Sequence, residues 1–554
     1  IFDCRVMSGL ALGGLVVANR ACPSRGPAFL VARALAVLAL VRLVRQRRVK
    51  SAALVAGLVF RFGVAGGRPA TLFGHLVQLV KFGRLGVRLP PRVPVIERLQ
   101  DFSRFGLWKR HQMERLWRSR YGPIFAIPTP RRMVVFVANA ELAEQVLANK
   151  EVFPSRGPTG FAQVVGQGLL GLPSGPVWAH HRKIISFFLT DKYLQDFASI
   201  TAGEVQVFLG KWDKAAASSA DVNAYYDLSV LTLDMIMRCG FGVEESERQQ
   251  LVPEEDNVMA RDLDYMLKHV VLLSIFPFYQ WLPGRHRWRV AEIRKRGEEL
   301  RDKLFAGAVE RARSGSAPPS MLSSLVSAKN PDGTAALTIK EIADELHTIR
   351  GAGHETTGNT MCWALMLLSR HPEVLSKVQA EVDREVAGDV PTWEEIKSLR
   401  YCQQVIFETL RLYPTVPSFP RYSVASTKLG PYDIPRGCMV YVTPGAMNHD
   451  PELWVEPTMF RPERFDELPD LLPGRPVGVP GGSKYGFLPF GAGPRTCVGQ
   501  RLAMMEAVQI LGAVTKRYQF ALRDEHVEEF ADITLGPKRG MYLRPRLREA
   551  KKGH

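Results

Sequence analysis

One cysteine near the end of the chain limits what this protein can be. Cys497 follows a stretch rich in glycine and proline, Gly486–Pro494, which predicts a tight loop. The residues after it, 502–511, have the composition of a helix, so Cys497 is expected where a loop enters a helix. The helix dipole and free backbone N–H groups at such a place lower the pKa of a thiol. The cysteine is therefore expected to be a nucleophile or a metal ligand.

The cysteine pattern argues against zinc. No Cys-x-x-Cys pair stands near Cys497, and the seven cysteines of the chain are scattered, as in a protein of a reducing compartment. A single thiolate suffices as the axial ligand of a haem iron, where it donates electron density and favours O–O cleavage. The alternative is a buried structural cysteine beside a glycine-rich turn.

The spacing around Cys497 carries a family resemblance. Phe490-Gly491-x-Gly493-x-Arg495-x-Cys497-x-Gly499 is similar to the haem-binding loop of the cytochrome P-450 family, the haem-thiolate monooxygenases. The resemblance implies that Cys497 ligates the iron of a haem b and that Phe490 and Arg495 belong to the haem site.

A second motif of the same family lies upstream. Trp178 and Arg182 are four residues apart, so they share one face of a predicted helix. The resemblance implies that both contact the haem propionates, because an indole N–H and a guanidinium fork suit carboxylates. The alternative is an ordinary helix with a basic face. The neighbouring His181 is expected at the surface.

A long helix is predicted between a capping box, Thr338–Glu341, and a stop at His371-Pro372. Its middle, Gly351–Gly358, holds three glycines, each of which costs roughly 1 kcal/mol against alanine. This cost indicates a close approach of another group or a local widening of the helix. The resemblance implies that Glu355 and Thr356 are an acid–alcohol pair that delivers protons over the haem. A helix packing seam is the alternative.

Three residues match a structural element of the family. Glu408 and Arg411 share one helix face, and Arg464 follows in a Pro-x-x-Phe-x-Pro-Glu-Arg-Phe motif. The resemblance implies that the two arginines enclose the carboxylate in a buried lock near the haem loop. Arg421 matches an arginine that contacts a propionate. The late turn Ile533–Pro537 is expected to line the substrate pocket.

Short elements surround these motifs. Strands are predicted at Ile124–Pro128, Met133–Val137, Leu429–Ile434 and Met439–Thr443, and helices at Phe105–Arg120 and Leu142–Ala148. Between residues 198 and 328 the pattern is mostly helical, with breaks at Phe276–Pro283 and Arg313–Ser320. The fold expected from the resemblance is mainly α with a small β region, the cytochrome P-450 fold.

The positive charge of the chain is concentrated at one end. The net charge is +18 over 554 residues; residues 1–95 hold 15 Arg and Lys and one acid, so they carry +14 and leave +4 for the rest. A nearly neutral body argues against nucleic acid as a partner and favours a membrane or targeting role for the basic end.

The basic end is apolar but interrupted by charges. The stretch 27–44 could span a membrane if its arginines reach the interface, and Arg45, Arg47, Arg48 and Lys50 would flank it on the cytoplasmic side. A signal anchor or monotopic helix in the endoplasmic reticulum is expected, and an organelle transit segment, for a plastid or another organelle membrane, is the alternative. Leu89–Pro94 predicts a stiff linker.

The predicted domains are therefore a basic anchor or targeting segment with its linker, a haem-thiolate monooxygenase domain and a tail. Their predicted limits are residues 1–95, 96–547 and 548–554.

The resemblance also implies an activity. It predicts insertion of one oxygen atom of O₂ into a small apolar substrate. The Gly-His-Glu-Thr-Thr sequence and Pro414–Phe419 look most like branches that hydroxylate fatty acids or carotenoids. No flavin or nicotinamide motif is recognisable, so an NADPH-dependent flavoprotein reductase or a ferredoxin is expected to supply electrons. A haem-thiolate isomerase or dehydratase that uses no O₂, and a non-catalytic ligand carrier, are the alternatives.

Overall fold

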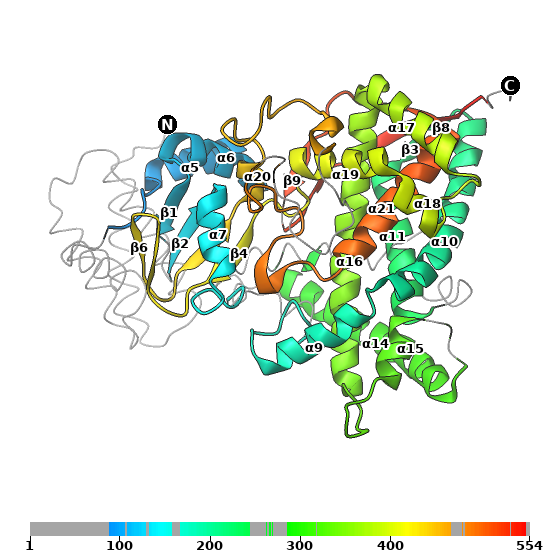
Figure 1. Cartoon of the computed structure of the whole chain (residues 1–554), viewed down its shortest axis with the longest axis horizontal. Helices are drawn as coiled ribbons and strands as arrows, with labels where there is room; N and C mark the ends of the chain where they lie inside the picture. The colour runs from blue at the N-terminus through cyan, green and yellow to red at the C-terminus, as the bar shows by residue number, and fades with distance from the viewer. Residues whose placement is uncertain are drawn as a thin grey trace, which may run out of the picture. The chain divides into compact units, whose positions relative to one another are not determined.

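Most of the residues that the structure describes are helical, and a small β region accompanies them (Figure 1). The computed structural model describes residues 88–105, 108–128, 132–157, 167–243, 262, 265–266, 269, 285–316, 318, 320–466, 479, 482–531 and 533–549. The predicted anchor up to residue 87, the predicted break at 276–283 and residues 550–554 of the tail lie outside the described residues. Nearly all described residues belong to one unit, which comprises Leu89–Pro128, Met133–Gln280 and Gly284–His554.

Fourteen α-helices and two short 3₁₀ helices fall within the described residues. The α-helices are α5 (Val95–Phe105), α6 (Arg110–Tyr121), α7 (Ala140–Ala148), α9 (Pro176–Phe187), α10 (Asp191–Ala217), α11 (Ala224–Phe241), α14 (Arg285–Ser314), α15 (Met321–Ser327), α16 (Ile339–Arg370), α17 (Pro372–Glu385), α18 (Trp393–Ser398), α19 (Arg400–Leu412), α20 (Pro444–Met447) and α21 (Gln500–Arg517). The 3₁₀ helices are η3 (Pro462–Phe465) and η4 (Gly493–Arg495). Among the described residues, no helix is both long and apolar enough to cross a membrane.

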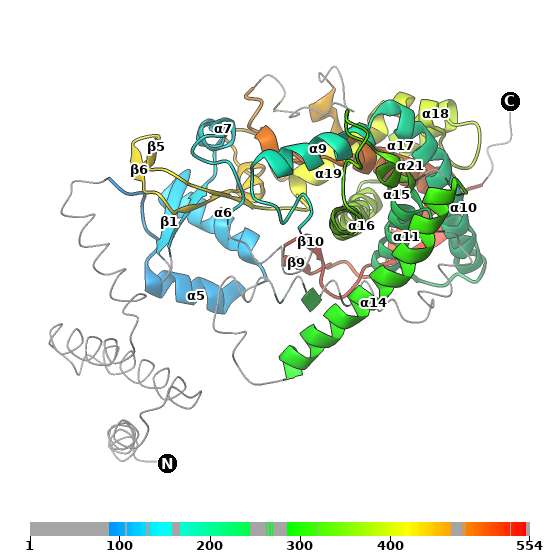
Figure 2. The same cartoon turned by 90° about the horizontal axis from the view of Figure 1, so that it is seen from below.

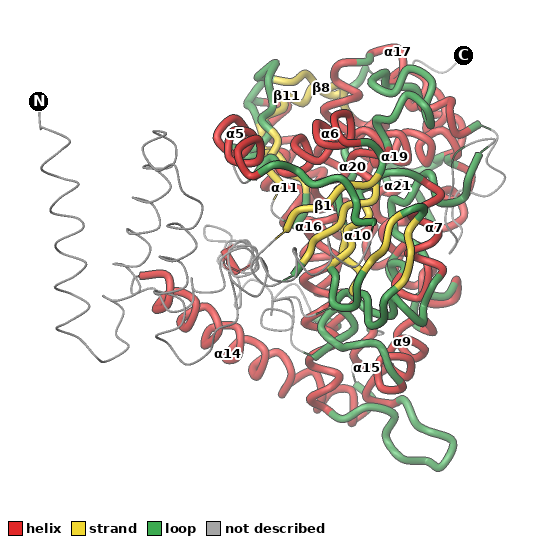
Figure 3. Tube along the Cα trace, turned by 90° about the vertical axis from the view of Figure 1, so that its left-hand side faces the viewer, coloured by secondary structure: helices red, strands yellow, loops and turns green. Residues whose placement is uncertain are grey.

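The strands form four small sheets (Figure 3). The largest has the order β1-β2-β7-β4, in which β2 and β7 are parallel and the other neighbours antiparallel. The others are β3-β11-β8 and the pairs β9-β10 and β5-β6. The strands are β1 (Ile124–Pro128), β2 (Met133–Val137), β3 (Val222–Asn223), β4 (Phe419–Tyr422), β5 (Thr427–Leu429), β6 (Tyr432–Ile434), β7 (Met439–Val442), β8 (Tyr518–Leu522), β9 (Glu529–Ala531), β10 (Leu535–Pro537) and β11 (Tyr542–Leu547).

The long helix α16 runs through the helical part and contacts α11, α19 and α21 (Figure 2). The predicted capping box is confirmed: the Thr338 hydroxyl accepts from the Glu341 N–H at 3.2 Å, and the Glu341 carboxylate accepts from the Thr338 N–H at 2.8 Å. The helix ends at Arg370, as predicted, because Pro372 opens the next helix.

Two of the glycines in α16 serve packing. A Cβ on Gly353 would lie 2.7 Å from Cδ1 of Ile236 on α11, and one on Gly358 would lie 3.3 Å from the Thr232 hydroxyl. The Thr232 hydroxyl also donates to the carbonyl of His354 at 2.8 Å. Residues 351–360 stay α-helical throughout, so the possible widening of the helix is not observed. The alternative, a seam that brings α11 and α16 close together, accounts for both glycines.

Two predicted elements are divided in the structure. The helix predicted over Phe105–Arg120 is two helices, α5 and α6, and Gly106 lies in the sequence between them. The strand predicted over Leu429–Ile434 is the hairpin β5-β6. Gly430 has a φ of 53° at the turn, and the following proline cannot donate to a strand ladder. The remaining predicted strands agree with β1, β2 and β7 within one residue.

The end of the proline-rich stretch belongs to the folded body. Val93 is buried, and its N–H donates to the Ala126 carbonyl at 3.0 Å. The Ala126 N–H donates in turn to the Pro91 carbonyl at 2.8 Å. Residues 91–93 therefore lie along the edge of β1.

Glu408, Arg411 and Arg464 come together in the predicted geometry. Arg411 donates to both carboxylate oxygens of Glu408 at 2.7 Å, and Nε of Arg464 donates to Oε1 at 3.2 Å. Arg411 also donates to the carbonyls of Asn448, Pro457 and Met459, so its guanidinium is fully engaged. All three side chains are buried. Both guanidinium groups bond the same carboxylate and also donate to backbone carbonyls, so the cluster ties α19 to η3 although it holds one more cation than anion.

Candidate functional site around Cys497

The sulfur of Cys497 stands where a loop meets α21. Gly499 caps the helix, and the Cys497 N–H donates to the carbonyl of Phe490 at 2.9 Å, which closes the loop behind the cysteine. Of the five cysteines in the described part of the chain, Cys497 is the exposed one, and the other four are buried. The loop thus holds Cys497 at an exposed position.

Glycine is required in this loop for a steric reason. Gly493 has a φ of 73°, and a Cβ there would lie 2.3 Å from the carbonyl oxygen of Leu147 at the end of α7. Any other residue would push the loop away from α7. The glycine therefore fixes the place of the cysteine relative to the sheet side of the molecule.

The pKa of the Cys497 thiol differs from the sequence-based expectation. Surrounding protein atoms desolvate the sulfur and raise its pKa, against the lowering that the helix terminus was predicted to cause. A hydrogen bond from the Gly499 N–H and the charges of Arg182 and Arg156 act in the opposite direction. The protein thus supplies the donors and cations that favour a thiolate, but in this structure desolvation outweighs them.

Four arginines from separate elements form a cluster at this site, and two of them, Arg156 and Arg182, act on the Cys497 thiol. The four are Arg156 in the loop after α7, Arg182 on α9, Arg421 on β4 and Arg495 on η4. Burial, followed by mutual repulsion, lowers the pKa of Arg421 to about 9 and that of Arg495 to about 9. Burial lowers the pKa of Arg156 to about 10, although Cys497 opposes this shift. All three remain cations at neutral pH, so the site is strongly positive.

Among the described residues, the hydrogen-bond acceptors of Arg495 and Arg421 are backbone carbonyls and one hydroxyl, and none is a carboxylate. Arg495 donates to the carbonyls of Leu169 and Leu172 at 3.0 and 2.9 Å and to the Ser174 hydroxyl at 2.8 Å. Arg421 donates to the carbonyls of Pro420 and Ala492. In the described part of the chain, no ion pair joins any of the four to an acidic side chain.

Trp178 lies within the same cluster. The Arg495 guanidinium is 4.1 Å from the centre of its ring, and that of Arg182 is 5.7 Å away. The predicted helix is confirmed as α9, and its i, i+4 spacing brings Trp178 and Arg182 together. The indole therefore contacts two of the cations of the cluster.

This set of groups fits a haem. A cysteine at an exposed position, near four arginines without carboxylate partners among the described residues, suits a planar iron complex that carries two carboxylates. Cys497 would ligate the iron, and Arg156, Arg182 and Arg421 would meet the propionates. Arg495 is already committed to the loop at residues 169–174, so its main effect is to fix that loop against the cysteine.

The predicted acid–alcohol pair lies on α16. The Glu355 carboxylate accepts a hydrogen bond from the Thr534 hydroxyl at 2.8 Å. The Thr356 hydroxyl donates to the carbonyl of Ala352 one turn back at 2.7 Å. Thr357 points elsewhere, and its buried hydroxyl donates to Glu506 on α21 at 3.5 Å. The side chains of the two adjacent threonines therefore have different partners, and the buried Thr357 hydroxyl faces α21.

Comparison with known proteins identifies the family. The family described as Cytochrome P-450 matches residues 87–544. The chain belongs to the cytochrome P-450 family. It is therefore a haem-thiolate monooxygenase that uses O₂, and the predicted fold class and enzyme class are confirmed.

Relatives from plants and bacteria carry similar names. Cytochrome P-450 734A1 of Arabidopsis thaliana is 30% identical over 73% of this chain and 76% of its own length. The 7-deoxyloganic acid hydroxylase of Catharanthus roseus is 29% identical over 68% and 72%. The cyclooctat-9-en-7-ol 5-monooxygenase of Streptomyces melanosporofaciens is 28% identical over 74% and 86%. Two of these three names state a hydroxylase or monooxygenase reaction.

Two histidines lie near this P-450 site, and the predicted exposure of one of them was wrong. His181 was expected at the surface, but it is buried, and its Nδ1 lies 2.8 Å from Glu345 on α16. The second oxygen of Glu345 accepts from the N–H of Leu169, whose carbonyl Arg495 holds. His181 thus joins α9 and α16 to the loop behind the haem site. His354 is also buried, with Nδ1 3.2 Å from the Arg350 carbonyl.

Arg156 was not predicted as a site residue, because it lies in a proline- and glycine-containing loop without periodicity. Thr534 belongs to the turn Ile533–Pro537 that was expected to line the substrate pocket, but its hydrogen bond to Glu355 was not predicted. Both residues reach the site through the tertiary fold. Arg350 also lies on α16: its guanidinium is 3.3 Å from Nδ1 of His347, and its Nε finds no hydrogen-bond partner among the described residues.

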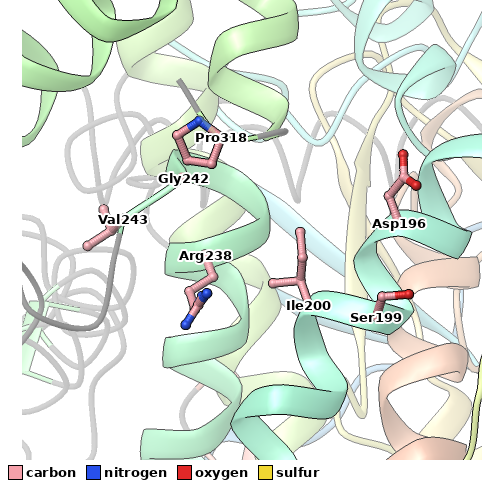
Figure 4. A pocket seen from close by; sticks show the side chains of 7 residues that line it. All are labelled: Asp196, Ser199, Ile200, Arg238, Gly242, Val243 and Pro318. Atoms are coloured by element: carbon pink, nitrogen blue, oxygen red, sulfur yellow. The ribbon is translucent and has the colours of Figure 1, made fainter. Parts of the chain in front are cut away.

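A separate cleft of about 260 Å³ lies between α10 and the end of α11 (Figure 4). Ile200, Arg238 and Pro318 are among its lining residues, and Arg238 pairs with Glu204 at 2.9 Å. None of the predicted site residues lines this cleft. It is not part of the haem site.

Replacing Arg421 with glutamine should weaken haem binding without unfolding the protein. The change removes a hydrogen-bond donor and a charge, and charged hydrogen bonds contribute roughly 1.5–3 kcal/mol, or about 10- to 100-fold in affinity. The haem-free variant should be at least as stable as the parent, because one of four repelling cations is gone. Haem transfer to an acceptor protein and denaturant unfolding measure the two effects.

Arg517→Gln is the matched control, since Arg517 pairs with Asp213 at 2.7 Å and takes no part in the cluster. It should leave haem transfer unchanged. Normal haem retention in Arg421→Gln would contradict the role given to the arginine cluster.

Proposed function

We propose that this P-450 hydroxylates a small apolar molecule of lipid or isoprenoid type. The observation that carries the proposal is the open face of α16. Ala352, which is exposed in the middle of the helix, shares that face with Thr356, so a small uncharged surface adjoins the acid–alcohol pair. The resemblance of the α16 sequence to fatty-acid and carotenoid hydroxylases supports the same class. A screen of lipids and isoprenoids by haem spectral shift tests it; shifts with polar ligands alone would contradict it.

The electrons come from a separate protein in this proposal, either an NADPH-dependent flavoprotein reductase or a ferredoxin. The exposed basic residues of α9, His180 and Lys183 among them, offer a surface for an acidic partner. Reconstitution of turnover with each class of donor distinguishes the two.

A membrane location is proposed on the charge pattern. Residues 1–95 carry +14, and a basic, apolar segment of this kind favours an anionic membrane surface. The endoplasmic reticulum is the proposed site, and a plastid or other organelle membrane is the alternative. Carbonate extraction after cell fractionation tests attachment: release of the full chain by mild salt alone would contradict an inserted segment.

The residues of α16 account for proton supply. A bound haem supplies the iron at which O₂ is activated. The Thr356 hydroxyl donates to the Ala352 carbonyl, which leaves its oxygen lone pairs to accept a hydrogen bond from water. Glu355, one residue before it, can exchange a proton with such a water. A positioned acid–base group of this kind contributes roughly 10²- to 10⁴-fold.

Thr356→Ala should uncouple the enzyme. It removes a hydroxyl but little volume, so haem and substrate should still bind, while peroxide formation rises and product per electron falls. Thr357→Ala should uncouple much less, because that hydroxyl faces Glu506 on another side of the helix. Product formed against reductant consumed measures both variants. Strong uncoupling by Thr357→Ala alone would show that the register assigned to this helix is wrong.

A further inference from the structure

The hairpin β9-β10 is tied to α6 at its first strand. Glu529 lies 2.5 Å from Nε2 of the buried His111 and accepts from Nε2 of Gln112 at 3.0 Å. Two residues on, the Ala531 N–H donates to the Trp108 carbonyl at 2.7 Å. The rings of Trp108 and Phe530 stack with their centres 5.2 Å apart. This end of the hairpin therefore has both polar and apolar anchors.

The second strand of the hairpin is tied to α16. The Leu535 N–H donates to the Thr415 carbonyl at 2.8 Å, and the Leu535 carbonyl accepts from the indole of Trp363 at 3.0 Å. Gly536 lies against Asn359, where a Cβ would be 2.8 Å from the amide oxygen. A hairpin held at both strands leaves its turn little freedom.

Thr534 is in that turn, between the two anchored strands. Its hydroxyl donates to Oε1 of Glu355 at 2.8 Å and accepts from the Asn359 amide at 3.4 Å. The side chain is 6% exposed, so it is a buried contact and offers little surface to a substrate. Asn359 is one helical turn beyond Glu355, so both residues lie on the same face of α16. The Thr534 hydroxyl therefore bonds two residues of this face, as acceptor from Asn359 and as donor to Glu355.

We propose that Thr534 is a positioning residue, which holds the Glu355 carboxyl in the orientation from which it supplies protons next to Thr356. This inference rests on the proposed function of Glu355. A glutamate side chain has three rotatable bonds before its carboxyl, and a buried hydroxyl donor at 2.8 Å restricts them. Without the donor, the carboxyl loses one restraint on its orientation.

The first experiment replaces Thr534 in the haem-loaded full chain. Thr534→Val keeps the shape and removes the hydroxyl, so product formed per electron should fall roughly 10-fold, the effect of one hydrogen bond to a charged group. The KM for substrate should stay unchanged, and Thr534→Ser should restore coupling. Thr415→Val is the matched control: Thr415 is equally buried and bonds Thr360 on the same helix at 2.8 Å, but does not touch Glu355. It should remain coupled.

The second experiment detects the hydrogen bond without turnover. Unfolding of the haem-loaded protein in denaturant is measured for Thr534→Val, Glu355→Ala and the double variant. If the two side chains interact, the double variant should lose less stability than the sum of the single losses. Additive losses would overturn the proposal, because they would show no coupling between the two residues.

The two experiments together separate the possible failures. Uncoupling by Thr534→Val that disappears in a Glu355→Ala background supports the proposal. Uncoupling that persists there, or a raised KM with normal coupling, overturns it in favour of substrate contact. If Glu355→Ala itself stays coupled, the proposed proton route through Glu355 is wrong, and Thr534 has no positioning role in the reaction whatever the unfolding data show.

Discussion

The convergence of four guanidinium groups at one place is the constraint on which this site depends. Arg156, Arg182, Arg421 and Arg495 come from a loop, a helix, a strand and a 3₁₀ helix, and burial, followed by repulsion within the cluster, lowers the pKa of Arg421 and Arg495. Such an arrangement costs folding free energy unless an anion neutralises it. The two propionates of a bound haem would neutralise the cluster, and Cys497 would ligate the haem iron. The surrounding elements are then understood as the frame that holds these cations together.

That frame is built from contacts that leave little room for movement. The Glu408–Arg411–Arg464 cluster ties α19 to η3, and Gly493 lets the cysteine loop lie directly against α7. On the other side, the glycines of α16 bring α11 close, so the helix that carries Glu355 and Thr356 is fixed by its neighbours. The hairpin β9-β10 adds a third constraint, through Thr534, on the acid itself.

The sequence predicted those parts of the site whose signal is local. The cysteine loop, the capping box at Thr338 and the i, i+3 pair of Glu408 and Arg411 each depend on residues close together in the chain. Arg156 could not be found in this way, because only the tertiary fold brings it to Cys497. The turn that contains Thr534 was expected at the substrate pocket, but its contact with Glu355 also depends on the tertiary fold. Gly353 and Gly358 show a different limit of the sequence. A glycine that makes room for a neighbouring helix cannot be told, from the sequence, from a glycine that makes room for a ligand.

The division of Leu429–Ile434 into a hairpin has a comparable cause. Its apolar residues resemble one strand, but the Gly430-Pro431 dipeptide in its middle is a turn signal, and the positive φ of Gly430 shows the turn. His181 was misplaced because its partner, Glu345, comes from a helix more than one hundred residues away in sequence. Burial of a polar residue depends on such a partner, and composition alone does not disclose it.

The absorption spectrum of the reduced protein under carbon monoxide tests the central claim, that Cys497 is the thiolate ligand of a haem iron. The parent protein should show the red-shifted Soret band of a thiolate–carbonyl adduct, and Cys438→Ala, which changes a buried cysteine, should show it too. Cys497→His should lose that band. A normal thiolate band in Cys497→His would contradict the account.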